Sequence, residues 1–153
     1  MMPIRSACIA ATLIAMASKR REIRRLAMQV LYQIDATGEC DREALAETID
    51  ETHDPPDVCR EGLALALSAW ADREQADALV AELTPAWPTH RQPPVDRAIL
   101  RLACHEMRCG RTPAKVAINE AVELAKRYAD HASPAFINGV LDKLARRLDR
   151  VTG

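Results

Sequence analysis

The chain has 153 residues, of which 48% are apolar and 28% are charged, and its formal net charge is -1. This composition is typical of a single soluble globular domain and excludes a wholly disordered chain. Aromatic residues make up only 3% of the chain. Because strands favour aromatic and β-branched side chains, this shortage favours helices.

Charge is distributed in blocks along the chain. Residues 1–34 carry six basic and one acidic side chain, residues 35–82 carry three and fourteen, and residues 83–153 carry twelve and seven. Two basic ends around an acidic middle can present a basic face to nucleic acid. The alternative is that these charges only cover solvated helix faces. The five cysteines fit reduced thiols in a cytosolic protein better than a disulfide scaffold.

Residues 1–16 are predicted to be an N-terminal extension of the domain. Residues 1–5 are weakly basic, residues 7–17 are apolar apart from one threonine, and residues 15–17 resemble a signal-peptidase site. A secretory signal is therefore one interpretation, although eleven residues are too few to span a bilayer, which takes about 20. We prefer a second interpretation, in which the true start is Met16, because it opens the sequence MASKRRE.

The first predicted helix follows this extension and ends at Gly38, a residue type that often terminates helices. Apolar residues recur in it at three- and four-residue steps, which indicates one buried face: Ile23, Leu26, Ala27, Val30, Leu31 and Ile34. A second helix is predicted over Arg42–Glu51, with Leu45 and Ile49 facing inward.

Four later helices are each expected to begin at a proline, which lacks the amide hydrogen that a first turn leaves unpaired. The predicted starts are Asp54–Pro55, Pro94, Thr112–Pro113 and Ser133–Pro134, with the Asp, Thr and Ser side chains as caps. Gly110 is expected to end the helix that begins at Pro94. The apolar stripes of the last three helices are Val95, Ile99 and Leu102; Ala117, Ala121 and Leu124; and Ile137, Val140, Leu141, Leu144 and Leu148.

Residues 84–94 hold four prolines and Trp87, and we expect a linker with one buried aromatic side chain. No alternation of apolar and polar residues is long enough to predict a strand. The predicted fold class is therefore all-α, with about seven helices in two packed sub-bundles.

One stretch resembles the zinc-binding HExxH helix, with a cysteine in place of the second histidine. Residues His105–Cys109 put the two candidate ligands on one helix face, but no other histidine lies in a recognisable ligand pattern. The favoured interpretation is an ordinary helix in which Cys104 and Met107 pack inward and His105 is exposed. Glycine-rich phosphate loops and nucleophile motifs are absent from the sequence, so we predict no catalytic residue, no metal site and no cofactor.

Two features are candidates for contact with nucleic acid. The first is a cluster of five cations within seven residues: Lys19, Arg20, Arg21, Arg24 and Arg25. Cations at the predicted start of a helix oppose its macrodipole, so contact with phosphates is the gain that we expect from them. The second is Phe136, the one phenylalanine, which is either part of the core or a platform on which a base stacks.

Several stretches together resemble the NusB family of transcription antitermination proteins. They are KRREIRRLAMQVLYQID, similar to the family's first helix, PVDRAILRLACHEM, similar to its central helix, and VAINEAVELAKRY and FINGVLDKLA, similar to its two most specific motifs. The resemblance covers about residues 17–150. It implies a single domain with an N-terminal three-helix part over about residues 17–72 and a C-terminal four-helix part over about residues 73–150.

The resemblance also implies a cytoplasmic, non-enzymatic protein that does not associate with membranes. Such a protein pairs with NusE, a ribosomal protein, and the heterodimer binds boxA-type single-stranded RNA. Within the antitermination complex it helps RNA polymerase pass terminators, notably in ribosomal RNA operons. Some members of the family are thought to form homodimers when NusE is absent.

Several residues of this sequence match positions of the family's RNA and NusE contacts. The resemblance implies that the five N-terminal cations and Phe136 fall on the RNA side. It also implies that Tyr32 and Asp96 face NusE or the seam between NusE and RNA. Gly139 is interpreted as a residue that allows a close helix crossing. One departure is Ala135, which stands where the family often has a basic residue just before the phenylalanine.

Two other functions fit parts of the sequence. A similar helical domain occurs at the N-terminus of some RNA cytosine methyltransferases, so the chain could be the RNA-binding fragment of such an enzyme. A secreted helical protein is the other alternative, and only residues 1–17 support it.

Overall fold

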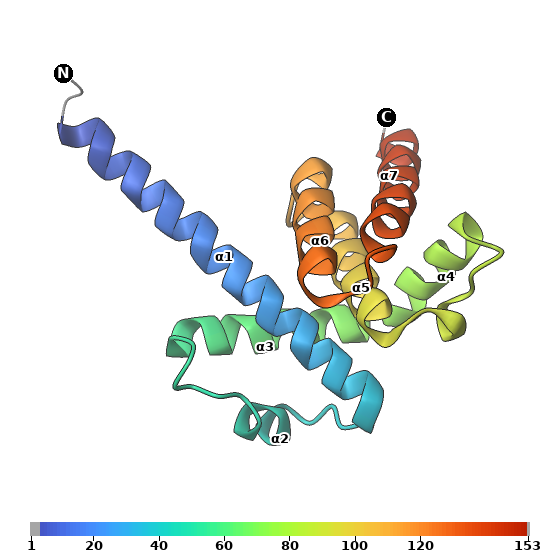
Figure 1. Cartoon of the computed structure of the whole chain (residues 1–153), viewed down its shortest axis with the longest axis horizontal. Helices are drawn as coiled ribbons and strands as arrows, with labels where there is room; N and C mark the ends of the chain where they lie inside the picture. Colours follow the sequence, from blue (N-terminus) through green and yellow to red (C-terminus); the bar gives the residue numbers. More distant parts are fainter. Residues whose placement is uncertain (1–3, 153) are drawn as a thin grey trace.

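The computed structural model of the protein describes residues 4–152. These residues form seven α-helices and one short 3₁₀ helix, with no strand among them (Figure 1). The α-helices are α1 (Ile4–Thr37), α2 (Arg42–Glu47), α3 (Pro56–Ala71), α4 (Arg73–Leu83), α5 (Pro94–Arg108), α6 (Ala114–Tyr128) and α7 (Ser133–Thr152). The prediction of an all-α fold with about seven helices is confirmed.

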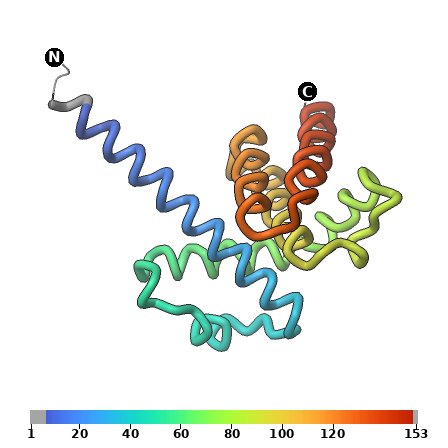
Figure 2. Tube along the Cα trace, in the orientation of Figure 1, coloured from blue at the N-terminus to red at the C-terminus, as the bar shows by residue number. Residues whose placement is uncertain are grey.

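The helices form two packed groups that meet at α5. Helix α1 crosses α3 on one side of the molecule, with α2 below them, and α4, α6 and α7 surround α5 on the other side (Figures 1 and 2). Helix α5 contacts α1 and α3 as well as α4, α6 and α7. It therefore joins the two sub-bundles that the sequence predicts.

Helix α1 is longer than the sequence analysis predicts, because residues 4–16 continue it without a break. This part projects from the body of the protein, and its large apolar side chains Ile9, Leu13 and Ile14 are 61%, 61% and 70% exposed (Figure 1). The five cations consequently lie in the middle of a helix, so the expectation that they oppose a helix N-terminus is wrong. Among the described residues, no helix is both long and apolar enough to cross a membrane. Residues 1–3 of the predicted extension lie outside the described residues.

The predicted apolar stripe of α1 forms the centre of the core. Its six residues, Ile23, Leu26, Ala27, Val30, Leu31 and Ile34, are all buried. Gly62 of α3 allows the close crossing of α1, because a Cβ at that position would lie 2.8 Å from Leu26 Cδ2. The same role predicted for Gly139 is wrong, since a Cβ there would meet nothing within 4 Å.

The helix ends follow the sequence signals only in part. Gly38 and Gly110 terminate α1 and α5 with φ values of +76° and +68°, as predicted. Pro55 and Pro113 themselves occupy the N-cap positions of α3 and α6, and a proline side chain has no oxygen that could accept from the first-turn amides. The predicted caps are wrong because Asp54 and Thr112 are engaged by arginines of α1 instead.

Two other local expectations are wrong. Helix α2 ends at Glu47 rather than Glu51, although Leu45 is fully buried and Ile49 packs against the core. Trp87, expected to be buried in the linker, is 45% exposed. The buried side chain of that segment is Gln92, whose amide nitrogen donates to the Trp87 carbonyl.

Candidate nucleic-acid interface

The five clustered cations of residues 19–25 lie on different faces of α1 and differ in their partners. Lys19 lies beside α3, where its Nζ is 2.8 Å from an Asp57 oxygen and 3.4 Å from a Glu61 oxygen. The hydrogen bond to Asp57 raises the pKa of Lys19 above its ordinary value. Both partners are partly exposed, so this pair is weak and its cation remains accessible.

Arg24 is a structural residue in this geometry. Its Nε donates at 3.1 Å to both carboxylate oxygens of Glu106, and its Nη2 donates to Thr112. The Arg24 and Glu106 side chains are only 12% and 3% exposed. This buried pair ties α1 to α5 and to the turn that precedes α6.

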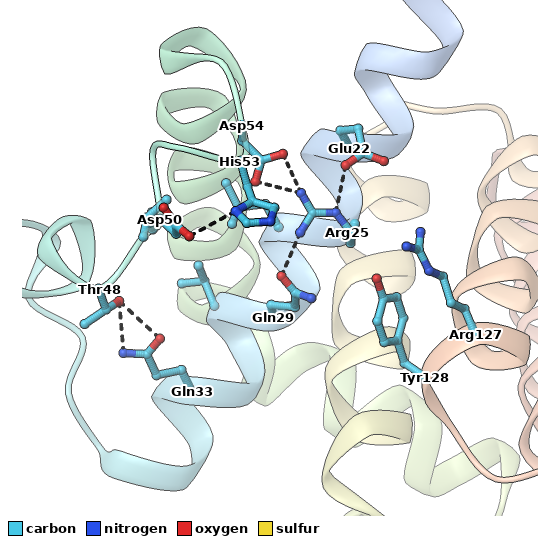
Figure 3. A pocket seen from close by; sticks show the side chains of 13 residues that line it. Glu22, Arg25, Gln29, Gln33, Thr48, Asp50, His53, Asp54, Arg127 and Tyr128 are labelled. Carbon is cyan, nitrogen blue, oxygen red and sulfur yellow. Dashed lines mark hydrogen bonds and ion pairs between the residues drawn. The ribbon is translucent and has the colours of Figure 1, made fainter.

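Arg25 is also saturated, as Figure 3 shows. Its guanidinium donates to both oxygens of Asp54 at 2.7 and 2.8 Å, to Glu22 at 2.8 Å and to Gln29 at 2.8 Å. Burial alone would lower the pKa of Arg25, but the hydrogen bonds to Asp54 and Glu22 leave that pKa raised. Direct phosphate contacts, predicted for Arg24 and Arg25, would compete with these internal partners.

Arg20 and Arg21 are the two exposed arginines of the cluster. The Arg21 side chain is 64% exposed, and its one partner among the described residues is Glu120 of α6, at 3.2 Å. Arg20 is exposed and makes no hydrogen bond or ion pair with the described part of the chain. Of the five predicted contacts, these two are the most available to an anionic ligand.

Phe136 lies on the first turn of α7, half-buried, and packs against the edge of the core. The neighbouring stripe residues Ile137, Val140, Leu141 and Leu144 are fully or almost fully buried, as predicted. The ring therefore combines partial packing with partial exposure, as a base-stacking side chain requires.

The two predicted partner contacts differ in accessibility. Tyr32 is 43% exposed on α1. Asp96 is only 3% exposed, and the Ser133 hydroxyl donates to its carboxylate from 2.9 Å. Burial raises the pKa of Asp96, and the hydrogen bond from Ser133 partly offsets this effect. Asp96 thus holds the start of α7 against α5, and direct contact with a partner stays a prediction that this burial does not favour.

The zinc motif has no support in the structure. Cys104 and Met107 are buried, as expected, but His105 is not exposed: its Nδ1 lies 3.3 Å from Asp72. No three residues of types that bind metals gather anywhere in the described part of the chain. Burial raises the pKa of Cys104 to about 12, which makes its thiol inert.

Three linked depressions follow the middle of α1. A groove of about 580 Å³ lies between α1 and α6, and a second of about 600 Å³ lies between α1 and the residues around the start of α6. A third cavity, of about 460 Å³, lies between α1, the loop before α3 and the end of α6 (Figure 3). Lys126, Arg127 and Arg111 contribute to these walls. The sequence motifs did not indicate these three cations, because Lys126 and Arg127 end α6, Arg111 lies in the turn before it, and only the tertiary fold brings both segments near α1.

Comparison with known proteins identifies relatives along nearly the whole chain. The sequence model of the NusB family matches residues 21–146. The transcription antitermination protein NusB of Roseiflexus sp. (strain RS-1) is 40% identical over 135 residues, which are 86% of this chain and 95% of that protein. The corresponding protein of Anaeromyxobacter sp. (strain Fw109-5) is 38% identical over 144 residues, which are 88% of this chain and all of the relative.

Two solved structures are similar in fold. NusB from T. maritima superposes with a TM-score of 0.73 at 32% identity, covering 83% of this chain and 90% of that one. A chain of the complex of antitermination factors NusB and NusE with dsRNA gives a TM-score of 0.74 at 26% identity. The match covers 85% of this chain and 98% of that one.

Proposed function

This chain belongs to the NusB family, and from that premise we propose that it is a transcription antitermination factor that binds RNA jointly with NusE. The RNA is of the boxA type, and the complex helps RNA polymerase to read through terminators, notably in ribosomal RNA operons. The protein acts by binding and not by catalysis.

The observation that carries this proposal is the likeness to the NusB chain crystallised with NusE and dsRNA, over 85% of this chain. The basic grooves beside α1 support it independently, because single-stranded RNA is held largely through its phosphates. Relatives of nearly the same length are named as antitermination proteins, which favours this function over the methyltransferase alternative.

We assign the RNA contacts to Arg20, Arg21 and Phe136, with Lys19 as an accessible neighbour. Tyr32 is the proposed contact with NusE, because its ring is exposed beyond the buried stripe of α1. The proposed complex forms in the cytoplasm together with RNA polymerase. In the absence of NusE we expect a homodimer, which light scattering of the purified protein would detect as twice the mass of one chain.

Fluorescence anisotropy tests the proposal. A boxA RNA and a scrambled RNA of equal length are titrated with the protein, each with and without NusE. The proposal predicts the tightest binding for boxA with NusE and much weaker binding for the scrambled strand. Equal affinity for both RNAs in the presence of NusE would contradict it.

A further inference from the structure

The groove between α1 and α6 is lined by more cations than the sequence motifs account for. Arg21, Arg24 and Arg25 come from α1, and Lys126 and Arg127 come from the last turn of α6. The acidic residues on its walls are Glu22, Glu120 and Glu123. The second groove adds Arg20 and Arg111, so the two together are lined by seven basic and four acidic side chains.

The acidic side chains of this groove are already paired. Glu22 accepts from Arg25, Glu120 accepts from Arg21, and Glu123 accepts from Lys126. An anion in the groove therefore meets neutralised carboxylates rather than free ones. The Lys126–Glu123 pair is 59% and 57% exposed, so it is weak and Lys126 can turn to another anion at little cost.

Arg127 is the least engaged cation of the groove. Its guanidinium lies 5.2 Å from the ring centroid of Tyr128, and it has no carboxylate partner among the described residues. In Figure 3 Arg127 stands opposite Arg25, and no hydrogen bond or ion pair joins Arg127 to any labelled residue. An exposed guanidinium held beside a ring is well placed to bind a phosphate bidentately.

The basic surface has a boundary at the cavity of Figure 3. Beyond Arg25 and Arg127 the wall carries Asp50, whose side chain is 61% exposed. A phosphate would be repelled there. At its opposite end the groove between α1 and α6 continues into the second groove, which Arg20 and Arg111 line. The two grooves share Arg24 and Glu120 as walls.

We propose that the groove between α1 and α6 binds the phosphate backbone of single-stranded RNA, with Lys126 and Arg127 as phosphate contacts opposite Arg21. This inference rests on the proposed RNA-binding function. It adds a second strip of contacts from α6, so that the strand lies between the two helices instead of along α1 alone.

The experiment measures the salt dependence of RNA affinity for the full chain with NusE and boxA RNA. Each phosphate contact with a single strand contributes about -0.7 to the slope of log K against log salt. We expect the double variant Lys126→Ala/Arg127→Ala to flatten that slope by about 1.4. Arg127→Lys should keep the slope in an otherwise unchanged chain, because the charge is retained.

A matched control removes two exposed cations from α7, Lys143→Ala/Arg150→Ala, neither of which lines the grooves. We expect its slope to equal that of the unmodified protein. An unchanged slope in the α6 variant, or an equal loss in the α7 control, would overturn the proposed groove while leaving RNA binding intact. If the unmodified protein binds boxA RNA no better than the scrambled strand, the proposed function itself fails. Melting curves of both variants report whether the fold is kept.

Discussion

Replacing Arg24 by alanine should destabilise the protein rather than act as the loss of a phosphate contact. The substitution removes both hydrogen bonds to Glu106 and the one to Thr112, and it leaves a carboxylate that is 3% exposed without its cation. Removing one partner of a buried ion pair costs about 3–5 kcal/mol. In a chain of this length each kcal/mol lowers the melting temperature by roughly 2–4 °C.

We therefore expect Arg24→Ala to melt at least about 6 °C below the unmodified protein. The control is Arg24→Met combined with Glu106→Leu, which replaces the pair by apolar side chains of similar size. Such replacements are often nearly neutral, so the double variant should recover most of the lost stability.

The assay is thermal unfolding followed by circular dichroism, together with the salt dependence of RNA binding well below the melting temperature. The expected result is a large loss of stability with an unchanged salt slope. An unchanged melting temperature with a flatter slope would contradict the structural role of Arg24, because Arg24 would then bind phosphate and not Glu106.

Three further predictions concern other parts of the fold. Gly62→Ala should lower the free energy of unfolding by about 1–3 kcal/mol, because the added methyl group overpacks against Leu26. Gly139 has open space around it, so Gly139→Ala should leave that free energy unchanged or raise it. Urea unfolding measures both variants, and equal effects would contradict the close crossing of α1 and α3. Because burial raises the folded-state pKa of Asp96 above 3.8, the native state binds this proton more tightly, and stability should fall as pH rises through the interval between 3.8 and that raised pKa. Asp96→Asn should remove this part of the pH dependence while keeping an acceptor for Ser133; a variant as pH-dependent as the parent would contradict it. Phe136→Leu should keep the melting temperature near that of the parent and weaken RNA binding about 5- to 150-fold in anisotropy; full RNA affinity would exclude base stacking.

The helices and their buried faces could be predicted because their signals are local. The stripe of α1 follows the helical period, and Gly38 and Gly110 have the positive φ that glycine adopts without strain. Helix starts were less predictable, since Asp54 and Thr112 could cap locally or bond to a distant arginine. The structure shows the bonds to arginine. The local sequence around Asp54 or Thr112 does not show which of the two partners the side chain takes, because the arginines lie far away along the chain.

The sequence could predict that cations of α1 gather near the candidate site, but not which of them are held by internal carboxylates. The sequence shows five cations on one segment, yet it does not show that Arg24 and Arg25 are held by Glu106 and Asp54, 82 and 29 residues away. For the same reason Lys126 was not recognised, because its position beside α1 depends on how α6 packs.

Joint binding of RNA by this protein and NusE is tested most directly by the affinity of the protein for NusE, measured with and without boxA RNA. Binding free energies are linked, so RNA must tighten the pairing with NusE by the same factor by which NusE tightens the binding of RNA. Calorimetry with the purified components measures both factors. Linkage makes the two factors equal, and joint binding predicts that their value is well above one for boxA RNA and close to one for a scrambled strand. A pairing with NusE that is unaffected by boxA RNA would contradict it.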